Sequence, residues 1–228
     1  MRFPALVPGR FVRRDNRFRA TVRVDGEARW AHVANSGRLL ELFQPERPVW
    51  LAPAARPGRK TDYDLKLVEH AGVLVSVDAR LPNPLFAEAL TTRRWPAFDY
   101  DLVEREVTLG QSRLDFRLSG PTGVCWVETK SVTLVEEGVA LFPDAPTIRG
   151  QRHLSELTGM AKEGDQAAVV FIIQRPDATQ FKPHNTADPA FTAALQAAAA
   201  SGVSVRAFTC QVSLAEIGIT VEIPVRMS

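Results

Sequence analysis

The hydrophobic pattern of the chain changes its period near residue 81, and this change restricts the available folds more than any other feature. Up to that point, apolar and polar residues alternate in short runs, the pattern of half-buried strands. Beyond it, helix-like segments alternate with strand-like ones, as in an α/β domain. At about 150 residues per domain, the 228 residues have room for one large domain or two small ones. We therefore predict two domains, over residues 1–80 and 81–228.

The first domain is expected to consist of short strands. Residues 10–33 predict two strands joined by a tight Asp-Gly turn at 25–26, and residues 46–52 and 63–78 predict three more. The segment 53–60 is rich in Pro, Gly and Arg and predicts an exposed basic loop. Five short strands with basic loops indicate a small OB-like β-barrel.

The second domain is expected to be α/β with a central mixed sheet. Asn83 is a plausible N-cap and Pro84 suits the first turn, so a helix is predicted over 84–92. The apolar run 167–173 is too short for most helices and predicts a buried parallel strand. The other expected elements are strands at about 102–109, 112–118, 123–131, 203–208 and 217–225, and helices at 147–163 and 188–200.

The net charge of +2 conceals an uneven distribution of charge. Residues 1–60 hold 13 basic and 5 acidic side chains, whereas the remaining 168 residues hold 15 basic and 21 acidic ones. Arginine forks match phosphate oxygens, so the first domain is expected to bind a polyanion. Exposed aromatic side chains among Phe18, Trp30, Trp50 and Tyr63 would add stacking platforms for bases, although most are expected in the core. The candidate DNA-binding residues are Arg13, Arg14, Arg17, Arg19, Arg38, Arg59 and Lys60.

Composition excludes several classes of protein. With 45% hydrophobic and 24% charged residues, the chain is an ordinary globular one. Cys125 and Cys210 are far apart and lie in apolar stretches, which argues against a disulfide scaffold or a cysteine zinc site. The longest apolar run is far shorter than the ~20 residues that span a membrane, and no signal-peptide core is present. We expect a cytoplasmic protein without membrane contact.

Three charged residues on two neighbouring strands form the candidate catalytic centre. Glu128 and Lys130 alternate with buried positions and so share one strand face, and Asp115 lies across a short hairpin. Two carboxylates this close can hold Mg²⁺ or Mn²⁺, which prefer oxygen ligands. Lys130 would then orient or deprotonate an attacking water, or offset charge on a phosphate. The alternative is a salt-bridge pair on a solvated sheet.

This arrangement resembles the PD-(D/E)xK fold of restriction-endonuclease-like nucleases, in which Asp115 and Glu128 would bind metal and Lys130 would be the catalytic lysine. The resemblance further implies a carboxylate from the preceding helix, for which Glu88 is the candidate and Glu106 the competitor. The candidate phosphate-binding residues are Arg113, Arg149 and His153, the last two being one helical turn apart. The alternative for His153 is a partly buried helix histidine bonded to backbone.

The segments SRLDF, VETKSVTL, FPDAPTIRGQRHLSEL and ANSGRL closely resemble the sugar fermentation stimulation protein A family. The resemblance covers essentially the whole chain and implies a DNA-binding protein with an OB-like domain followed by a nuclease-like domain. Members of that family often carry an acidic residue where this chain has Ile148.

Two functions are expected from these observations. The first is a largely sequence-non-specific DNA-binding protein with a Mg²⁺- or Mn²⁺-dependent nuclease site. The second is a non-enzymatic DNA-binding regulatory protein with a degenerate nuclease fold, linked to sugar metabolism. RNA and single-stranded DNA are alternative ligands, and a homodimer is an open alternative to a monomer.

Overall fold

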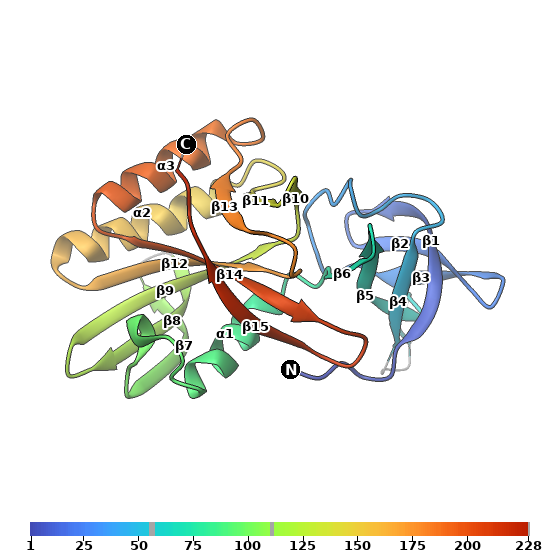
Figure 1. Cartoon of the computed structure of the whole chain (residues 1–228), viewed down its shortest axis with the longest axis horizontal. Coiled ribbons are helices and arrows are strands. Elements are labelled where there is room, and N and C mark those ends of the chain that lie inside the picture. The colour runs from blue at the N-terminus through green and yellow to red at the C-terminus, as the bar shows by residue number, and fades with distance from the viewer. Residues whose placement is uncertain (55–57, 110–111, 228) are drawn as a thin grey trace.

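The computed structural model describes residues 1–54, 58–109 and 112–227 and consists of two lobes (Figure 1). Strands β1–β6 form the first lobe, and the second contains α1, α2 and α3 with the remaining strands. The predicted OB-like barrel and the predicted α/β domain with a mixed sheet are both confirmed.

Five strands of the first lobe close into a barrel. The sheet runs β3-β2-β1-β4-β5-β6, and a parallel pairing of β3 with β5 at Ala31 and Tyr63 closes the ring. Phe11, Val22 and Leu51 are among the fully buried side chains inside it. The strands are β1 (Val7–Asn16), β2 (Arg19–Val24), β3 (Glu27–His32), β4 (Pro48–Pro53), β5 (Tyr63–His70) and β6 (Val73–Ser76).

The prediction of two strands within residues 10–33 is wrong, because the segment belongs to three. A turn at Arg17 and Phe18 separates β1 from β2, and Phe18 is half-exposed at its tip. The Asn16 side chain accepts a hydrogen bond from the Phe18 N–H at 2.9 Å, which stabilises the turn. Residues 13–17 are all polar, so no apolar–polar period marks where the first strand ends and the second begins.

The second lobe contains a six-stranded mixed sheet with helices on both faces (Figure 1). Its order is β15-β14-β12-β9-β8-β7, and β12 runs parallel to both β9 and β14 as the apolar run predicted. Helices α2 and α3 cover one face and α1 lies on the other. The strands are β7 (Leu102–Leu109), β8 (Ser112–Gly120), β9 (Gly123–Val132), β12 (Gln166–Ile173), β14 (Ser204–Val212) and β15 (Ile217–Ile223).

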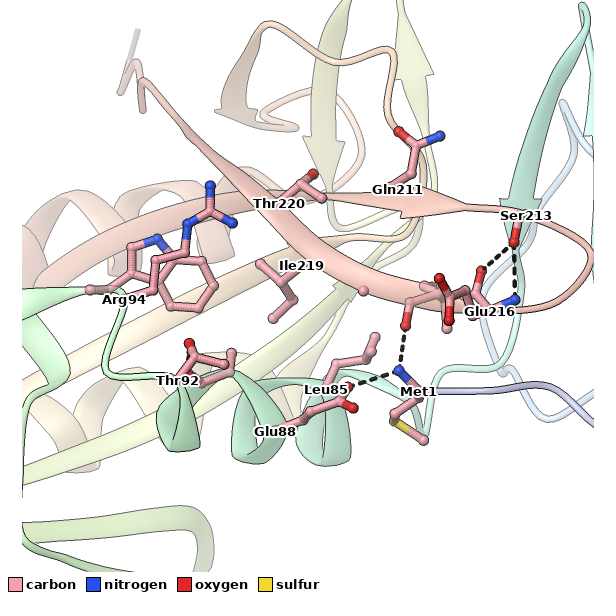
Figure 2. A pocket seen from close by; sticks show the side chains of 14 residues that line it. Met1, Leu85, Glu88, Thr92, Arg94, Gln211, Ser213, Glu216, Ile219 and Thr220 are labelled. Atoms are coloured by element: carbon pink, nitrogen blue, oxygen red, sulfur yellow. Dashed lines mark hydrogen bonds and ion pairs between the residues drawn. The ribbon is translucent and has the colours of Figure 1, made fainter.

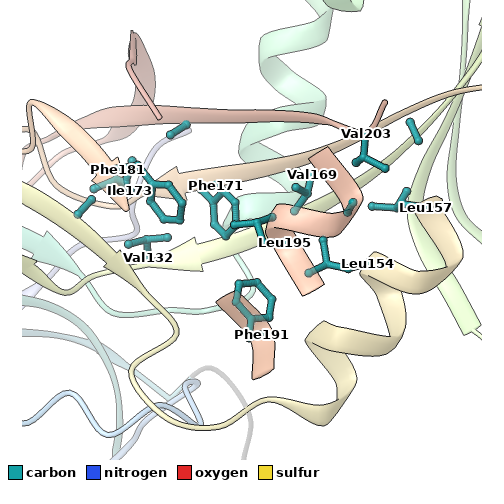
Figure 3. Packing of buried hydrophobic residues seen from close by; sticks show 14 of the residues in the cluster. Val132, Leu154, Leu157, Val169, Phe171, Ile173, Phe181, Phe191, Leu195 and Val203 are labelled. Carbon is teal, nitrogen blue, oxygen red and sulfur yellow. The ribbon is translucent and has the colours of Figure 1, made fainter. Parts of the chain in front are cut away.

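Both helices on the first face begin within one residue of their predicted positions. Thr147 caps α2 (Ile148–Glu163) and Asp188 caps α3 (Pro189–Ala200). Asp188 also accepts a hydrogen bond from the Thr147 N–H at 2.8 Å, so it ties the starts of the two helices together. Figure 3 shows Phe191 and Leu195 of α3 packed with Leu154 of α2 against Phe171 of β12. This packing fixes where the first turn of α2 meets the sheet.

Helix α1 (Pro82–Thr91) begins before the predicted position. Leu81 occupies the N-cap and makes no side-chain capping bond, so the predicted Asn83 cap is wrong. Asn83 lies in the first turn, and its amide instead contacts Asp115 in the sheet. Two prolines, Pro82 and Pro84, suit a first helical turn, and the earlier one begins the helix.

Several short elements were not predicted. Strands β10 (Val135–Glu136), β11 (Val139–Phe142) and β13 (Gln180–Pro183) form a small second sheet, and a 3₁₀ turn spans Pro96–Phe98. Each is too short to carry a recognisable period.

The N-terminal segment leaves the barrel and contacts the second lobe. Arg2 forms a β-bridge with Glu216, and the Phe3 N–H donates to the Ala215 carbonyl oxygen at 2.8 Å. The barrel lobe is therefore joined to the second lobe by this segment as well as by the chain that leads into α1.

Two further contacts hold the lobes together near the end of β9. Asp144, after β11, accepts a hydrogen bond from the Leu39 N–H of the barrel lobe at 3.2 Å. The backbone carbonyl of Gln174, after β12, accepts a hydrogen bond from the Ser76 N–H at 3.0 Å. Its side-chain amide donates to the Asp78 carbonyl oxygen at 3.1 Å. A Cβ atom at Gly37 would lie 2.5 Å from the Asp144 carboxylate, so a larger residue there would have to displace the side chain that accepts the Leu39 N–H.

Both cysteine thiols are free and buried, as expected for small apolar side chains. Burial raises the pKa of Cys125 to about 11 and that of Cys210 to about 12. Within the described residues, no helix combines the length and apolar character needed to cross a membrane.

Candidate active site

Strands β8 and β9 separate where the candidate carboxylates lie. Their ladder ends at the pair of Phe116 and Val127. Beyond it, Asp115 Oδ2 accepts hydrogen bonds from the Thr129 N–H at 2.8 Å and from its hydroxyl at 2.7 Å. A side-chain carboxylate thus replaces a strand carbonyl as the acceptor for this backbone amide. Asn83 of α1 donates to the other oxygen, Oδ1, at 2.8 Å.

Glu128 and Lys130 share one face of β9, as strand alternation predicted. The Lys130 Nζ donates to Glu128 Oε1 at 2.6 Å. Glu128 is only 4% exposed, so the pair is not a salt bridge on a solvated surface. Its second oxygen, Oε2, is buried and has no hydrogen-bond partner among the described residues. Leaving such an atom unpaired costs free energy, so it is the point at which a ligand is expected.

His153 lies beneath this pair and does not face a substrate. It is 2% exposed, and its Nδ1 contacts Glu128 Oε1. Its Nε2 accepts a hydrogen bond from Arg149 Nε at 3.3 Å. Both ring nitrogens have protein partners, so the predicted contact with a scissile phosphate finds no free ring nitrogen in this arrangement. The helical spacing that brought it next to Arg149 was correct, but the histidine occupies the buried side of α2.

The two carboxyl groups have opposite pKa shifts. Burial and the neighbouring Glu128 carboxylate raise the pKa of Asp115, against the opposing effect of its Thr129 hydrogen bonds. Burial alone would also raise the pKa of Glu128, but Lys130 and His153 outweigh it and bring this pKa below its ordinary value. Glu128 is therefore the carboxyl group that stays ionised most readily, which suits a ligand for a cation.

A pocket of about 340 Å³ opens onto Asp115 and Glu128. Three arginines, Arg80, Arg105 and Arg149, line it together with the carboxylates. Lys130 contacts Glu128 but is not among the lining residues. With Glu106 also in its lining, the pocket combines three acidic groups with three guanidinium groups, which is a suitable setting for a cation and a phosphate.

Glu88 does not reach this pocket. It lines a separate cavity of about 510 Å³ between α1 and β15, where its carboxylate accepts from the Met1 amino group at 2.8 Å (Figure 2). At 3.6 residues per turn, Glu88 lies about 140° around α1 from Asn83, the residue that faces Asp115. The competing Glu106 on β7 does line the pocket, and there it pairs with Arg113 at 3.5 Å. Arg113 itself is exposed and outside the pocket lining.

Several of the predicted DNA-binding arginines of the barrel have partners within the protein. Arg14 donates to five backbone carbonyls, including those of Gly37 and Asn35, and burial lowers its pKa, so it holds the 35–38 loop in place. Arg13 and Arg19 pair with Asp15.

The remaining basic residues of the barrel lie closer to solvent. Arg59 pairs with Asp64 at 2.7 Å, and Arg17, Arg38 and Lys60 are exposed. The Arg19 guanidinium lies over the half-exposed Trp30 ring, 4.5 Å from its centroid, so one aromatic surface with a cation beside it is available to a ligand.

Comparison with known proteins decides the family. The model of the SfsA N-terminal OB domain matches residues 12–77, and that of the sugar fermentation stimulation protein RE domain matches residues 80–216. The chain belongs to the sugar fermentation stimulation protein family. The family resemblance stated from the motifs is thereby confirmed.

Relatives from several organisms align over nearly the whole chain. The sugar fermentation stimulation protein homologues of Desulforamulus reducens and Moorella thermoacetica are each 45% identical over 225 residues, covering 98% and 97% of this chain and 94% and 97% of theirs. The solved structure of Pyrococcus furiosus SfsA in complex with Ca²⁺ has a TM-score of 0.91 and 36% identity, covering 99% of this chain and 98% of that one.

The nuclease-like fold of this family implies a metal ion. The residues present fit an ion that needs only one or two protein carboxylates as ligands. No cluster of three or more His, Cys, Asp or Glu side chains suited to a metal occurs within the described residues. Mg²⁺, however, is commonly held by one or two carboxylates and keeps several waters. The free Glu128 Oε2 and the lone pairs remaining on Asp115 are consistent with that coordination.

Sequence reasoning missed Asn83, Thr129 and Arg105 as parts of the site. Asn83 was assigned to a cap, and Thr129 alternates away from Glu128. Arg105 donates to the Asn83 side chain at 3.1 Å, which holds the amide toward Asp115. These roles depend on where α1 meets the sheet, and no local pattern carries that information.

Proposed function

We propose that this protein is a metal-dependent phosphodiesterase that acts on nucleic acid held by its barrel lobe. The observation that carries the proposal is the Glu128 Oε2 atom, buried and unpartnered at a pocket shared with Asp115. That the Pyrococcus relative was solved with Ca²⁺, another cation that prefers oxygen ligands, supports a divalent ion.

Each residue has a distinct task in this scheme. Asp115 and Glu128 would hold Mg²⁺ or Mn²⁺, which when bound supplies positive charge and an activated water. Lys130 keeps Glu128 ionised through its 2.6 Å hydrogen bond. Arg149 and Arg105 line the pocket and offset the negative charge that grows on the phosphate oxygens during attack. Holding the attacking water close to the phosphorus atom in one pocket would further increase the rate of hydrolysis.

The test is cleavage by the full chain of single- and double-stranded DNA and RNA, with Mg²⁺ or Mn²⁺ and with chelator. We expect metal-dependent cleavage that Glu128→Gln and Lys130→Ala abolish while nucleic-acid binding persists. Absence of cleavage of every form with either metal would remove the enzymatic proposal.

A non-enzymatic DNA-binding regulator is the second candidate. It is favoured by the basic barrel lobe with its exposed Trp30 and by the lack of a three-residue metal cluster in the described part of the chain. It predicts salt-sensitive binding that no divalent ion affects. Under either proposal the partner is nucleic acid, and the two unpaired thiols agree with the reducing cytoplasm as the location.

A further inference from the structure

His153 makes two contacts that the proposed chemistry leaves unexplained. It is buried on α2 between Arg149, which lines the pocket, and Glu128, which provides the free carboxylate oxygen. A buried imidazole with both nitrogens engaged is held in a single orientation. The question is what this orientation does to the groups on either side.

The contacts determine the tautomer. A guanidinium group only donates hydrogen bonds, so the Nε2 atom that faces Arg149 Nε at 3.3 Å is the acceptor and carries no proton. In the neutral imidazole the proton is then on Nδ1, and Nδ1–H donates to Glu128 Oε1. Lys130 Nζ also lies 3.3 Å from Nδ1, but an ammonium cannot donate to a protonated nitrogen, so Lys130 donates to Glu128 Oε1 at 2.6 Å instead.

Two donors consequently meet on one oxygen of Glu128. Lys130 and His153 both contact Oε1, and neither contacts Oε2. Together they restrain the carboxylate group in both position and rotation. Oε2 is left without a partner at the pocket, which is the arrangement a ligand-binding carboxylate requires.

We propose that His153 is a positioning residue that orients Glu128 toward a divalent ion and connects that carboxylate to the pocket arginine Arg149. The inference rests on the proposed function, because it concerns the same ion. Beyond that function, the buried contacts of His153 with Glu128 and Arg149 would raise the affinity for the ion, and not only help α2 to pack.

Two amide variants separate these roles. The amide nitrogen of His153→Asn lies where Nδ1 lies, so this variant keeps the donor to Glu128. The amide of His153→Gln reaches the Nε2 position and so keeps a contact with Arg149 but loses the donor. Both amides are polar and similar in size, and His153→Leu removes both contacts. His184, which contacts the Pro143 carbonyl away from the pocket, provides the control His184→Asn.

The experiment is a Mn²⁺ titration of the full-length protein and its variants, followed by the EPR signal of free Mn²⁺, with a thermal unfolding curve for each. Loss of an outer contact to a metal ligand weakens affinity by about 10- to 100-fold. We expect that loss for His153→Gln and His153→Leu, and affinity within about threefold of the unaltered chain for His153→Asn and His184→Asn. Asn and Gln variants that fold and bind Mn²⁺ equally well would overturn the positioning role alone. If the unaltered chain binds no Mn²⁺, the proposed metal site and this inference both fail.

Discussion

At the scale of single residues, the site depends on a side chain that accepts a hydrogen bond from the backbone. Asp115 ends the β8–β9 ladder by accepting the Thr129 N–H, and Asn83 holds its second oxygen. The same carboxylate therefore contributes to folding and to the proposed ion site. A substitution there affects both, unless it keeps an acceptor oxygen.

Asp115→Ala should destabilise the protein by about 1–3 kcal/mol, because it leaves the buried Thr129 N–H without an acceptor. Asp115→Asn keeps one acceptor oxygen and should cost less than the alanine variant while still weakening ion binding. Urea unfolding of the two variants measures the difference. Equal stability of both would show that the carboxylate does not sustain the strand contact.

At the scale of elements, the N-terminus of α2 is the part of the structure that brings Arg149 and His153 to the sheet. Its first turn contains no acidic residue, and Ile148 there is 82% exposed. A helix N-terminus carries partial positive charge, which a negatively charged side chain would stabilise. The apolar Ile148 provides no such stabilisation.

Ile148→Glu is therefore expected to stabilise the fold by about 0.3–1 kcal/mol through attraction to the helix dipole. Ile148→Gln is the matched uncharged control and should give little of this gain. The difference in thermal midpoint between the two should shrink in high salt. A glutamate variant that is no more stable than the glutamine one would contradict the electrostatic origin.

Elements show what could be predicted from the sequence. Alternation placed Glu128 beside Lys130, and the starts of the two outer helices were predicted to within one residue, because these are local patterns. The predicted start of α1 was two residues too late, and Glu88 lies on a face of this helix that lines a different cavity from the Asp115 pocket. The contact of His153 with Glu128 has no local signal in the sequence, because it depends on how α2 packs against β9.

At the scale of the whole molecule, Asp78 lies where the lobes meet. Its carboxylate binds Lys66 of β5 at 3.0 Å and Arg80 of the pocket at 2.6 Å. Burial alone would raise its pKa, but Arg80 and Lys66 outweigh burial and bring the pKa below the ordinary 3.8. The ionised carboxylate thus helps to fix the barrel beside the pocket.

A carboxyl group whose pKa is lowered by folding contributes stability that is present above its unfolded pKa and is lost as pH falls through the folded value. We expect the free energy of unfolding to fall as the pH drops below 3.8, and Asp78→Asn to reduce the part of that fall due to this group. Denaturant titrations from neutral to acid pH measure it. An unchanged pH slope in the variant would show that Asp78 does not contribute.

The barrel lobe is expected to hold nucleic acid through exposed cations. Arg17→Glu should weaken binding. It should also reduce the slope of log K against log salt concentration by about one for each phosphate contact that is lost. Arg226→Glu on the second lobe, also exposed, is the control. Fluorescence anisotropy with labelled DNA at several salt concentrations tests this, and equal losses in both variants would argue against a barrel contact.

The central claim is that Asp115 and Glu128 hold a divalent cation. The most direct measurement is an anomalous-scattering map from crystals soaked in Mn²⁺. We predict a peak in the pocket within bonding distance of Glu128 Oε2 and the Asp115 carboxylate. A pocket without a peak in crystals that diffract well at saturating Mn²⁺ would contradict the account.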